Sequence, residues 1–227
     1  MLMAMLCATV ASAGLAGEAP LVEAGTTVRP PVVRKLLIIG NSLTRHGPNE
    51  ALGWPHTCGM AATSPAHDYA HLTLERIAAM QPQLRPEMVL TNLSDEAHMH
   101  GFEHVLPRDA DLVIIQVGDN YRGAVNVAEL QQPYAQMIAA IGASGDPHIF
   151  CISTWGNAAL NPFLRAAAEQ EGAVFVDINH LFADPLNRAA AEGHFTHAGV
   201  NWHPGDRGMA AIAETLWTHL SALWRTE

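Results

Sequence analysis

A serine directly follows the first short apolar run of the chain. Residues 35–40 (KLLIIG) end in glycine, and Asn41, Ser42 and Leu43 come next. On a tight turn after a strand, a serine hydroxyl reaches solvent and nearby N–H groups can receive a developing oxyanion. Ser42 is therefore a candidate nucleophile, although a serine in this position more often caps a helix. The Gly-x-Ser-x-Gly elbow of α/β-hydrolases is excluded because Thr44 replaces its second glycine.

Two further segments carry side chains that suit acyl-transfer chemistry. Asn120 closes the segment that follows the apolar run 112–118, and its amide can donate to an oxyanion. Such a donor was worth roughly 3–4 kcal/mol in a well-studied protease. His203 precedes the last helical stretch and can serve as a general base. Each residue alone is weak evidence, because Asp-Asn pairs favour turns and the chain contains thirteen histidines.

The order of elements brings these three residues to one edge of a sheet. Helical stretches are expected from Ser64-Pro65 to Met80, from Pro133, from Asn161-Pro162 to Gly172, and across the final segment. They alternate with strands, which predicts a parallel, doubly wound sheet whose ligands bind beyond the carboxyl ends of the strands. The expected strands are apolar runs at 35–40, 112–118, 148–154 and 173–178, with a weaker one at 87–93.

Taken together, four segments resemble the conserved blocks of the SGNH (GDSL-like) hydrolase family, in the family's order. The resemblance covers residues 35 to about 220 and implies a flavodoxin-like three-layer α/β/α sandwich with a central parallel sheet of about five strands. It also implies a serine esterase that needs no cofactor. The matching segments are GNSL (40–43), GW through GMAA (53–62), GDN (118–120) and HPGDRGM (203–209).

The resemblance implies a role for each matching residue. Ser42 would be the nucleophile, and His203 would be the general base and later the acid. The oxyanion would be held by the backbone N–H groups of Ser42 and Gly59 and by the side chain of Asn120.

The chain departs from the family pattern at two positions. Tyr121 stands where the third block usually has aspartate. Val200 stands three residues before His203, where the family carries the acid that orients the histidine. In a serine protease, replacing the corresponding aspartate costs about 10⁴ in kcat, so His203 needs another partner.

Several groups are candidates to hold His203. We prefer a Ser–His dyad whose histidine is held by a backbone carbonyl, as in some carbohydrate esterases of the family, or by water. Asp206 is expected to cap the last helix instead. A carboxylate from another loop is the alternative, with Glu103, Asp184 and Glu192 as candidates.

Tryptophans accompany the site segments. Trp54, Trp155 and Trp202 all fall at the predicted rim of the sheet. Their rings either bind substrate, by stacking on a sugar or covering an acyl chain, or pack within the protein. His194 and His197 either line the substrate entrance or are ordinary loop residues.

No metal site is predicted. His98, His100 and His104 have a spacing that can bind a metal. No carboxylate and histidine set completes a recognised site around them, so solvated surface histidines are the preferred interpretation.

Composition narrows the class of protein and its partners. The formal net charge is −10 and no Lys/Arg-rich tract occurs, so nucleic acid is excluded as a partner. No 18-residue apolar run follows the N-terminus, so no membrane span is expected. Cys58 and Cys151 either pair or stay free, and the oligomeric state is left open.

The chain is expected to hold one domain, residues 35–227, behind a signal peptide and a linker. Residues 1–16 are apolar and contain the small-residue pattern Ala11-Ser12-Ala13, which predicts an exported, periplasmic or secreted protein. An uncleaved, disordered tail is the alternative for this segment. Residues 17–34 contain Pro20, Pro30 and Pro31 and are expected to form the linker.

The predicted function is hydrolysis of a carboxylic ester through an acyl-serine. The expected substrate is a small-molecule or glycan ester with a short acyl group, acetyl above all, on a saccharide. An O-acyltransferase and a non-catalytic saccharide-binding protein, the latter suggested by Val200, are the alternatives.

Overall fold

A five-stranded parallel sheet forms the centre of the molecule. The computed structural model describes residues 31–96, 98–99, 101–104, 109–121 and 128–225. The strand order is β2-β1-β3-β4-β5, and every neighbouring pair is parallel. The strands are β1 (Lys35–Gly40), β2 (Glu87–Asn92), β3 (Leu112–Gln116), β4 (His148–Ile152) and β5 (Val174–Val176).

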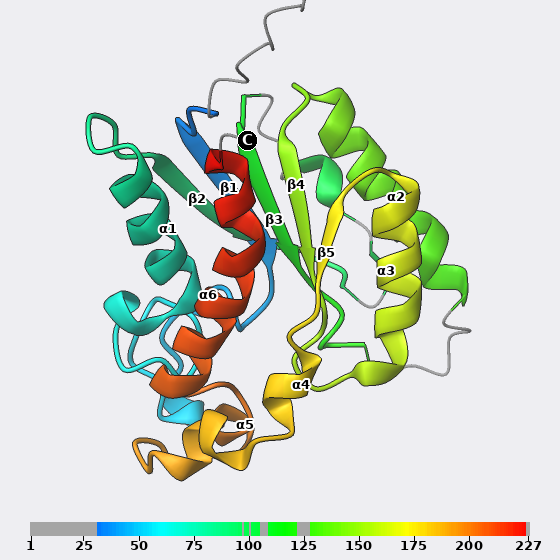
Figure 1. Cartoon of the computed structure of the whole chain (residues 1–227). Helices are drawn as coiled ribbons and strands as arrows, with labels where there is room; N and C mark the ends of the chain where they lie inside the picture. The colour runs from blue at the N-terminus through cyan, green and yellow to red at the C-terminus, as the bar shows by residue number, and fades with distance from the viewer. Residues whose placement is uncertain (1–30, 97, 100, 105–108, 122–127, 226–227) are drawn as a thin grey trace, which may run out of the picture.

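Helices cover both faces of this sheet (Figure 1). Side chains alternate along β1, so that Leu36 and Ile38 join the core beneath α1 and α6, whereas Leu37 and Ile39 join the core beneath α2 and α3. The predicted three-layer α/β/α sandwich is thus confirmed. The four covering helices are α1 (Tyr69–Met80), α2 (Ala128–Ala143), α3 (Asn161–Gln170) and α6 (Asp206–Leu220).

Shorter helices lie in the connections. Two are single α-turns, α4 (Asn179–Phe182) and α5 (Ala198–Asn201). The others are 3₁₀ turns at Glu50–Leu52, Pro65–His67, Phe102–His104, Ala158–Leu160, Pro185–Asn187, Ala189–Ala191 and Ser221–Trp224.

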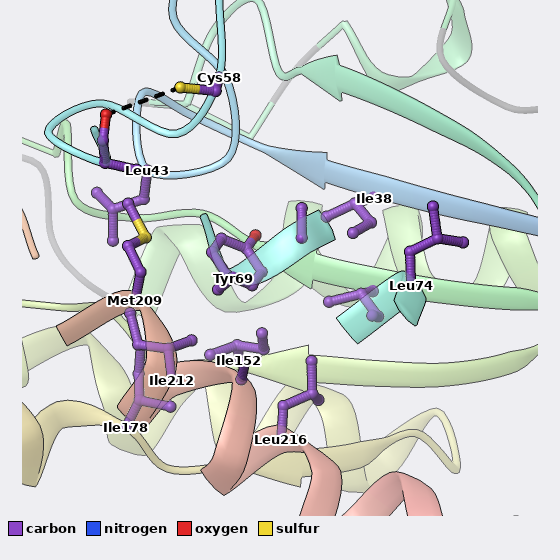
Figure 2. Packing of buried hydrophobic residues seen from close by; sticks show 14 of the residues in the cluster. Ile38, Leu43, Cys58, Tyr69, Leu74, Ile152, Ile178, Met209, Ile212 and Leu216 are labelled. Atoms are coloured by element: carbon purple, nitrogen blue, oxygen red, sulfur yellow. Dashed lines mark hydrogen bonds between the residues drawn. The ribbon is translucent and has the colours of Figure 1, made fainter. Parts of the chain in front are cut away.

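The core on the α1 and α6 side is dense and apolar. Figure 2 shows Tyr69 and Leu74 of α1 beside Ile38 of β1, and Ile212 and Leu216 of α6 beside Ile152 of β4, all within one cluster of buried side chains. This packing ties the last helix to α1 and to the sheet, and His203 lies just before that helix.

Two helices begin at positions other than the predicted ones. Ser64-Pro65 opens only a 3₁₀ turn, and α1 begins at Tyr69 because the buried Asp68 side chain caps it by accepting the N–H of His71 at 2.8 Å. Helix α2 begins five residues before Pro133, which lies inside it. The added turn brings Leu130 into the core, and its burial offsets the hydrogen bond that proline cannot make.

The strand order creates a crevice at the carboxyl edge of the sheet. The connections after β1 and β3 leave toward opposite faces, since β2 lies on one side of β1 and β3 on the other. In doubly wound sheets, ligands bind at such a switch point. Ser42 follows β1 and Asn120 follows β3, so both residues flank it.

Several other sequence-based expectations can be placed. Residues 1–30, which hold the expected signal peptide and most of the linker, lie outside the described residues. Among the residues the structure describes, no helix is both long and apolar enough to cross a membrane. Cys58 and Cys151 are free thiols in core clusters on opposite faces of the sheet, so they do not pair.

Candidate active site

The turn that carries Ser42 is built by its neighbours. The carbonyl of Asn41 accepts the N–H groups of Thr44 and Arg45, both at 3.0 Å, and the Asn41 side-chain oxygen accepts the N–H of Leu43 at 2.9 Å. A side chain at Gly40 would overlap that of Thr44, so the strand can turn this sharply only with glycine at its end. The turn leaves Ser42 half-exposed, and no acceptor binds its N–H among the described residues.

Ser42 and His203 form a hydrogen-bonded pair. Ser42 Oγ lies 2.8 Å from His203 Nε2, although 161 positions separate the two residues. The other ring nitrogen, Nδ1, lies 2.7 Å from the carbonyl oxygen of Gly199. Because a carbonyl only accepts, Nδ1 must carry the proton, which leaves the lone pair of Nε2 facing the serine hydroxyl. This arrangement can remove the proton of Ser42.

Burial keeps the His203 ring in its basic form. His203 is 8% exposed, and desolvation lowers its pKa to about 4, against the smaller raising effect of the Gly199 carbonyl. The nearby ring of His46 lowers it further. His203 is therefore neutral at pH 7 and able to accept a proton.

The Gly199 carbonyl occupies the place of the missing acid. Val200 is buried in the core and offers His203 nothing polar from its side chain. Of the candidate carboxylates, Asp184 pairs with Arg207 at 2.8 Å, and Glu192 accepts the N–H groups of Asp206 and Arg207. The structure gives none of them, Glu103 included, a hydrogen bond to His203, so the expectation of a backbone-held histidine fits the geometry.

Asp206 does not cap the last helix. Gly205 occupies the N-cap position of α6, and Glu192 accepts the first N–H groups of that helix. The carboxylate of Asp206 instead accepts the N–H and the hydroxyl of Thr63, at 2.8 and 2.5 Å. Asp206 is structural, as expected, but it joins α6 to the segment before α1.

Gly59 lies near the Ser42 turn, since the next residue, Met60, donates its N–H to the Ser42 carbonyl at 2.8 Å. The Gly59 N–H donates to the buried Asp68 carboxylate at 3.2 Å, so the N–H is already engaged. A Cβ at this position would overlap the carbonyl oxygen of Leu43. Glycine is required here because two backbone segments touch. Since its N–H is bonded to Asp68, we no longer consider Gly59 an oxyanion donor.

The three tryptophans divide into two buried rings and one at the site. Trp54 and Trp155 are 1% and 0% exposed, and their indole N–H groups donate to the carbonyls of His46 and Trp202. Both rings are enclosed by protein, so of the two alternatives the packing role holds for Trp54 and Trp155, and contact with substrate is wrong for them. Trp202 is half-buried, and its ring meets His203 edge-on at 5.3 Å.

Two cavities adjoin the Ser42–His203 pair, and Asn120 and Gly199 line both of them. The first, called the Leu52 cavity, has a volume of about 380 Å³, and the second, called the Asn157 cavity, about 490 Å³. The Leu52 cavity is also lined by Asn41, His46, Leu52, Met60, Asn92, Leu93 and His197. The Asn157 cavity is also lined by Asp119, Tyr121, Gly156, Asn157 and Trp202.

The other histidines singled out from sequence fall in different places. His197 lines the Leu52 cavity, whereas His194 is exposed and lies 4.0 Å from Glu192. His98 pairs with Asp95, and His100 lies outside the described residues. Within the described part of the chain, no group of three or more metal-binding side chains occurs.

Two buried carboxylates at the site were missed from sequence. Asp119 is 2% exposed and accepts the N–H groups of Trp155 and Gly156 at 3.2 and 3.1 Å. Glu96 is 5% exposed and accepts from the side chain of Asn41, which precedes Ser42, and from the N–H of Asn120. Burial raises the pKa of both carboxyl groups. Each follows the carboxyl end of a strand, and Asp119 also falls inside the GDN segment, although no role was predicted for either carboxylate.

Solved structures share this fold, although no protein-family model and no curated protein matches the sequence. TesA is 19% identical over 83% of this chain and 99% of its own, with a TM-score of 0.57. The psychrotrophic esterase EstA from Pseudoalteromonas sp. is 14% identical over 84% of this chain and 98% of its own, with a TM-score of 0.56. The acetyl xylan esterase AlAXEase is 14% identical over 82% of this chain and 99% of its own, with a TM-score of 0.55.

At such low identities the likeness concerns the fold. It covers nearly the whole described domain and nearly the whole of each of the three proteins. The chain therefore has the α/β/α fold that the resemblance to SGNH hydrolases implied.

Proposed function

We propose that this protein hydrolyses carboxylic esters through an acyl-serine intermediate on Ser42. The observation that carries the proposal is the short contact from Ser42 Oγ to His203 Nε2, with Nδ1 fixed on the Gly199 carbonyl. A buried, neutral imidazole aimed at a half-exposed serine hydroxyl is the arrangement that nucleophilic catalysis requires. The esterases among the fold neighbours give this reading further support.

The reaction follows from this geometry in two halves. Ser42 Oγ bonds to the ester carbonyl carbon while its proton passes to His203 Nε2, and the carbonyl oxygen becomes an oxyanion. The bond to the alcohol oxygen then breaks, and that oxygen takes the proton from Nε2. Water next attacks the acyl-serine, giving one proton to Nε2, which returns it to Ser42 Oγ as the acid leaves.

Two donors are proposed for the oxyanion. The N–H of Ser42 is without an acceptor among the described residues, and Asn120 lines both cavities beside the hydroxyl. Preorganised donors of this kind stabilise the transition state most where water is excluded.

The two cavities suit the two halves of an ester. The Leu52 cavity places Leu52, Met60 and Leu93 near the serine, which favours a short apolar acyl group. The Asn157 cavity combines the amide of Asn157 with the half-buried ring of Trp202, and such a mixture of polar groups and an aromatic surface suits a saccharide. We therefore propose an acetyl or similarly short ester on a sugar as the substrate.

The reaction is tested with p-nitrophenyl acetate and matched variants. Ser42→Ala and His203→Ala should each lower kcat by at least about 10³, since removing one member of such a pair disables the nucleophile. Ser64→Ala and His219→Ala, which change residues outside both cavities, should retain the parent rate. Hydrolysis that survives Ser42→Ala would refute the serine mechanism.

The substrate assignment is tested separately. Trp202→Ala should raise KM several-fold for an acetylated xylo-oligosaccharide while changing KM for methyl acetate little, because the sugar would contact the ring and the small methoxy group would not. Trp202→Phe should recover part of the loss. Equal effects on both substrates would count against a saccharide in the Asn157 cavity.

A further inference from the structure

One buried carboxylate connects the loops that follow three neighbouring strands. Glu96 lies in the loop after β2 and is 5% exposed. Its Oε1 accepts the side-chain amide of Asn41 at 2.7 Å and also the N–H of Gly118. Its Oε2 accepts the N–H of Asn120 at 3.3 Å. One side chain thus binds the loop after β1 and the loop after β3.

The groups that Glu96 holds stand next to the reacting positions. Asn41 precedes Ser42, and while its amide nitrogen donates to Glu96, its oxygen accepts the N–H of Leu43. These two bonds fix the Asn41 side chain between Glu96 and the Ser42 turn. On the facing loop, Glu96 binds the N–H groups of Gly118 and Asn120, and Asn120 carries the proposed oxyanion donor on its side chain.

We propose that Glu96 is a positioning residue. By binding the backbone N–H of Asn120 and the side chain of Asn41, it holds the Asn120 side-chain amide and the Ser42 turn at the separation needed to receive the oxyanion. The inference rests on the proposed role of Ser42. Glu96 does not line either cavity, so it acts through Asn41 and Asn120 and not by touching the substrate.

The chemistry of its partners explains why this position carries a carboxylate. Every partner of Glu96 named above is an N–H donor, and an ionised carboxylate offers only acceptors. Burial raises the pKa of Glu96, and the donated hydrogen bonds from Asn41 and Gly118 act against that effect. A buried charge is tolerated when hydrogen bonds satisfy it in this way. A glutamine amide would turn its own NH₂ group toward one of the N–H donors and lose that contact.

A double-mutant cycle tests the proposal. Glu96→Gln should lower kcat of p-nitrophenyl acetate hydrolysis by about tenfold or more with little change in KM, since it misplaces a donor used only in the transition state. Asn120→Ala should lower kcat by about 10²–10³. In the Asn120→Ala background, Glu96→Gln should cost clearly less than in the parent chain, because the part of its effect that runs through the Asn120 amide is then absent and only the part that runs through the Ser42 turn remains.

Two controls separate positioning from stability. Asp111→Asn changes a carboxylate that accepts the N–H groups of Arg34 and Lys35 at the opposite edge of the sheet, so it should lower the unfolding free energy and leave kcat unchanged. Glu96→Asp keeps the charge on a shorter side chain and should recover part of the rate lost in Glu96→Gln. If Glu96→Gln does not fold, Glu96→Asp replaces it in the cycle.

Either of two results would overturn the inference. One is a Glu96 variant that loses stability but keeps the parent kcat, and the other is a full, additive loss in the Asn120→Ala background. Failure of the proposed function looks different, because the parent activity would then be absent or would survive Ser42→Ala.

Discussion

At the scale of single residues, a main-chain carbonyl performs the orienting task that a carboxylate performs elsewhere. The Gly199 carbonyl fixes which nitrogen of His203 carries the proton, as an acid would. It brings no full negative charge to stabilise the imidazolium that would form in the proposed reaction. Desolvation is therefore not offset by an ion pair, and the pKa of His203 falls to about 4.

This lowered pKa predicts an unusual acid limb in the pH profile. As the pH is lowered, kcat/KM, which reports the free enzyme, should stay constant past pH 6.5 and decrease near pH 4. The same decrease near pH 4 is expected in Glu96→Gln, because the amide cannot titrate and His203 is unchanged. A limb centred at 6.5 would show that His203 is solvated in the working protein.

Folding stability should change over the same window. The pKa of His203 is lower in the folded chain than its ordinary value of 6.5, so the unfolded chain binds more protons between pH 6.5 and 4. This contribution to stability is complete above pH 6.5 and is lost as the pH falls toward 4. Circular dichroism recorded across the profile will distinguish loss of the base from loss of the fold.

At the scale of elements, the sequence was sufficient for the strands and for the order of the loops. Continuous apolar runs predict buried parallel strands well, and β1 begins and ends at the predicted residues. Helix starts were less predictable, since Pro133 inside α2 and the cap at Asp68 depend on tertiary burial of Leu130 and Asp68. The burial of Trp54 also depends on tertiary packing, so it could not be predicted from a position in the sequence that is equally typical of a residue at the rim of the sheet.

The turn after β1 provides a prediction at this scale. Gly40→Ala should destabilise the fold by about 1–3 kcal/mol, because the added methyl group overlaps the Thr44 side chain. It should also lower kcat, since Ser42 sits inside the displaced turn. Gly47→Ala is the matched control, because a Cβ there meets no atom within 4 Å. Equal unfolding free energies for the two variants, from urea titrations, would contradict this account of the turn.

At the scale of the whole molecule, the sheet gathers the site from distant parts of the chain. Ser42, Glu96, Asn120 and His203 come from four separate loops at one edge, and the packing of α6 against α1 and the sheet holds the last of them in place. The sequence predicted Ser42, Asn120 and His203 through a resemblance, whereas Glu96 required the strand order. A lone buried acid has no spacing pattern that would reveal it.

The two thiols report on this packing. Both Cys58 and Cys151 are fully buried, and desolvation raises each pKa to about 12. In a Cys7→Ser chain, both should react with Ellman's reagent only as fast as the domain unfolds. Complete reaction within the mixing time under native conditions would mean that the core on at least one face opens readily.

The most direct test of the central claim is to trap the acyl group on the protein. The chain is mixed with excess p-nitrophenyl acetate, quenched in acid, digested and mapped by mass spectrometry. The account predicts one acetyl group on the peptide that contains Ser42, absent in Ser42→Ala. An acetyl group on another residue at full occupancy, or rapid hydrolysis by the Ser42→Ala chain, would contradict it.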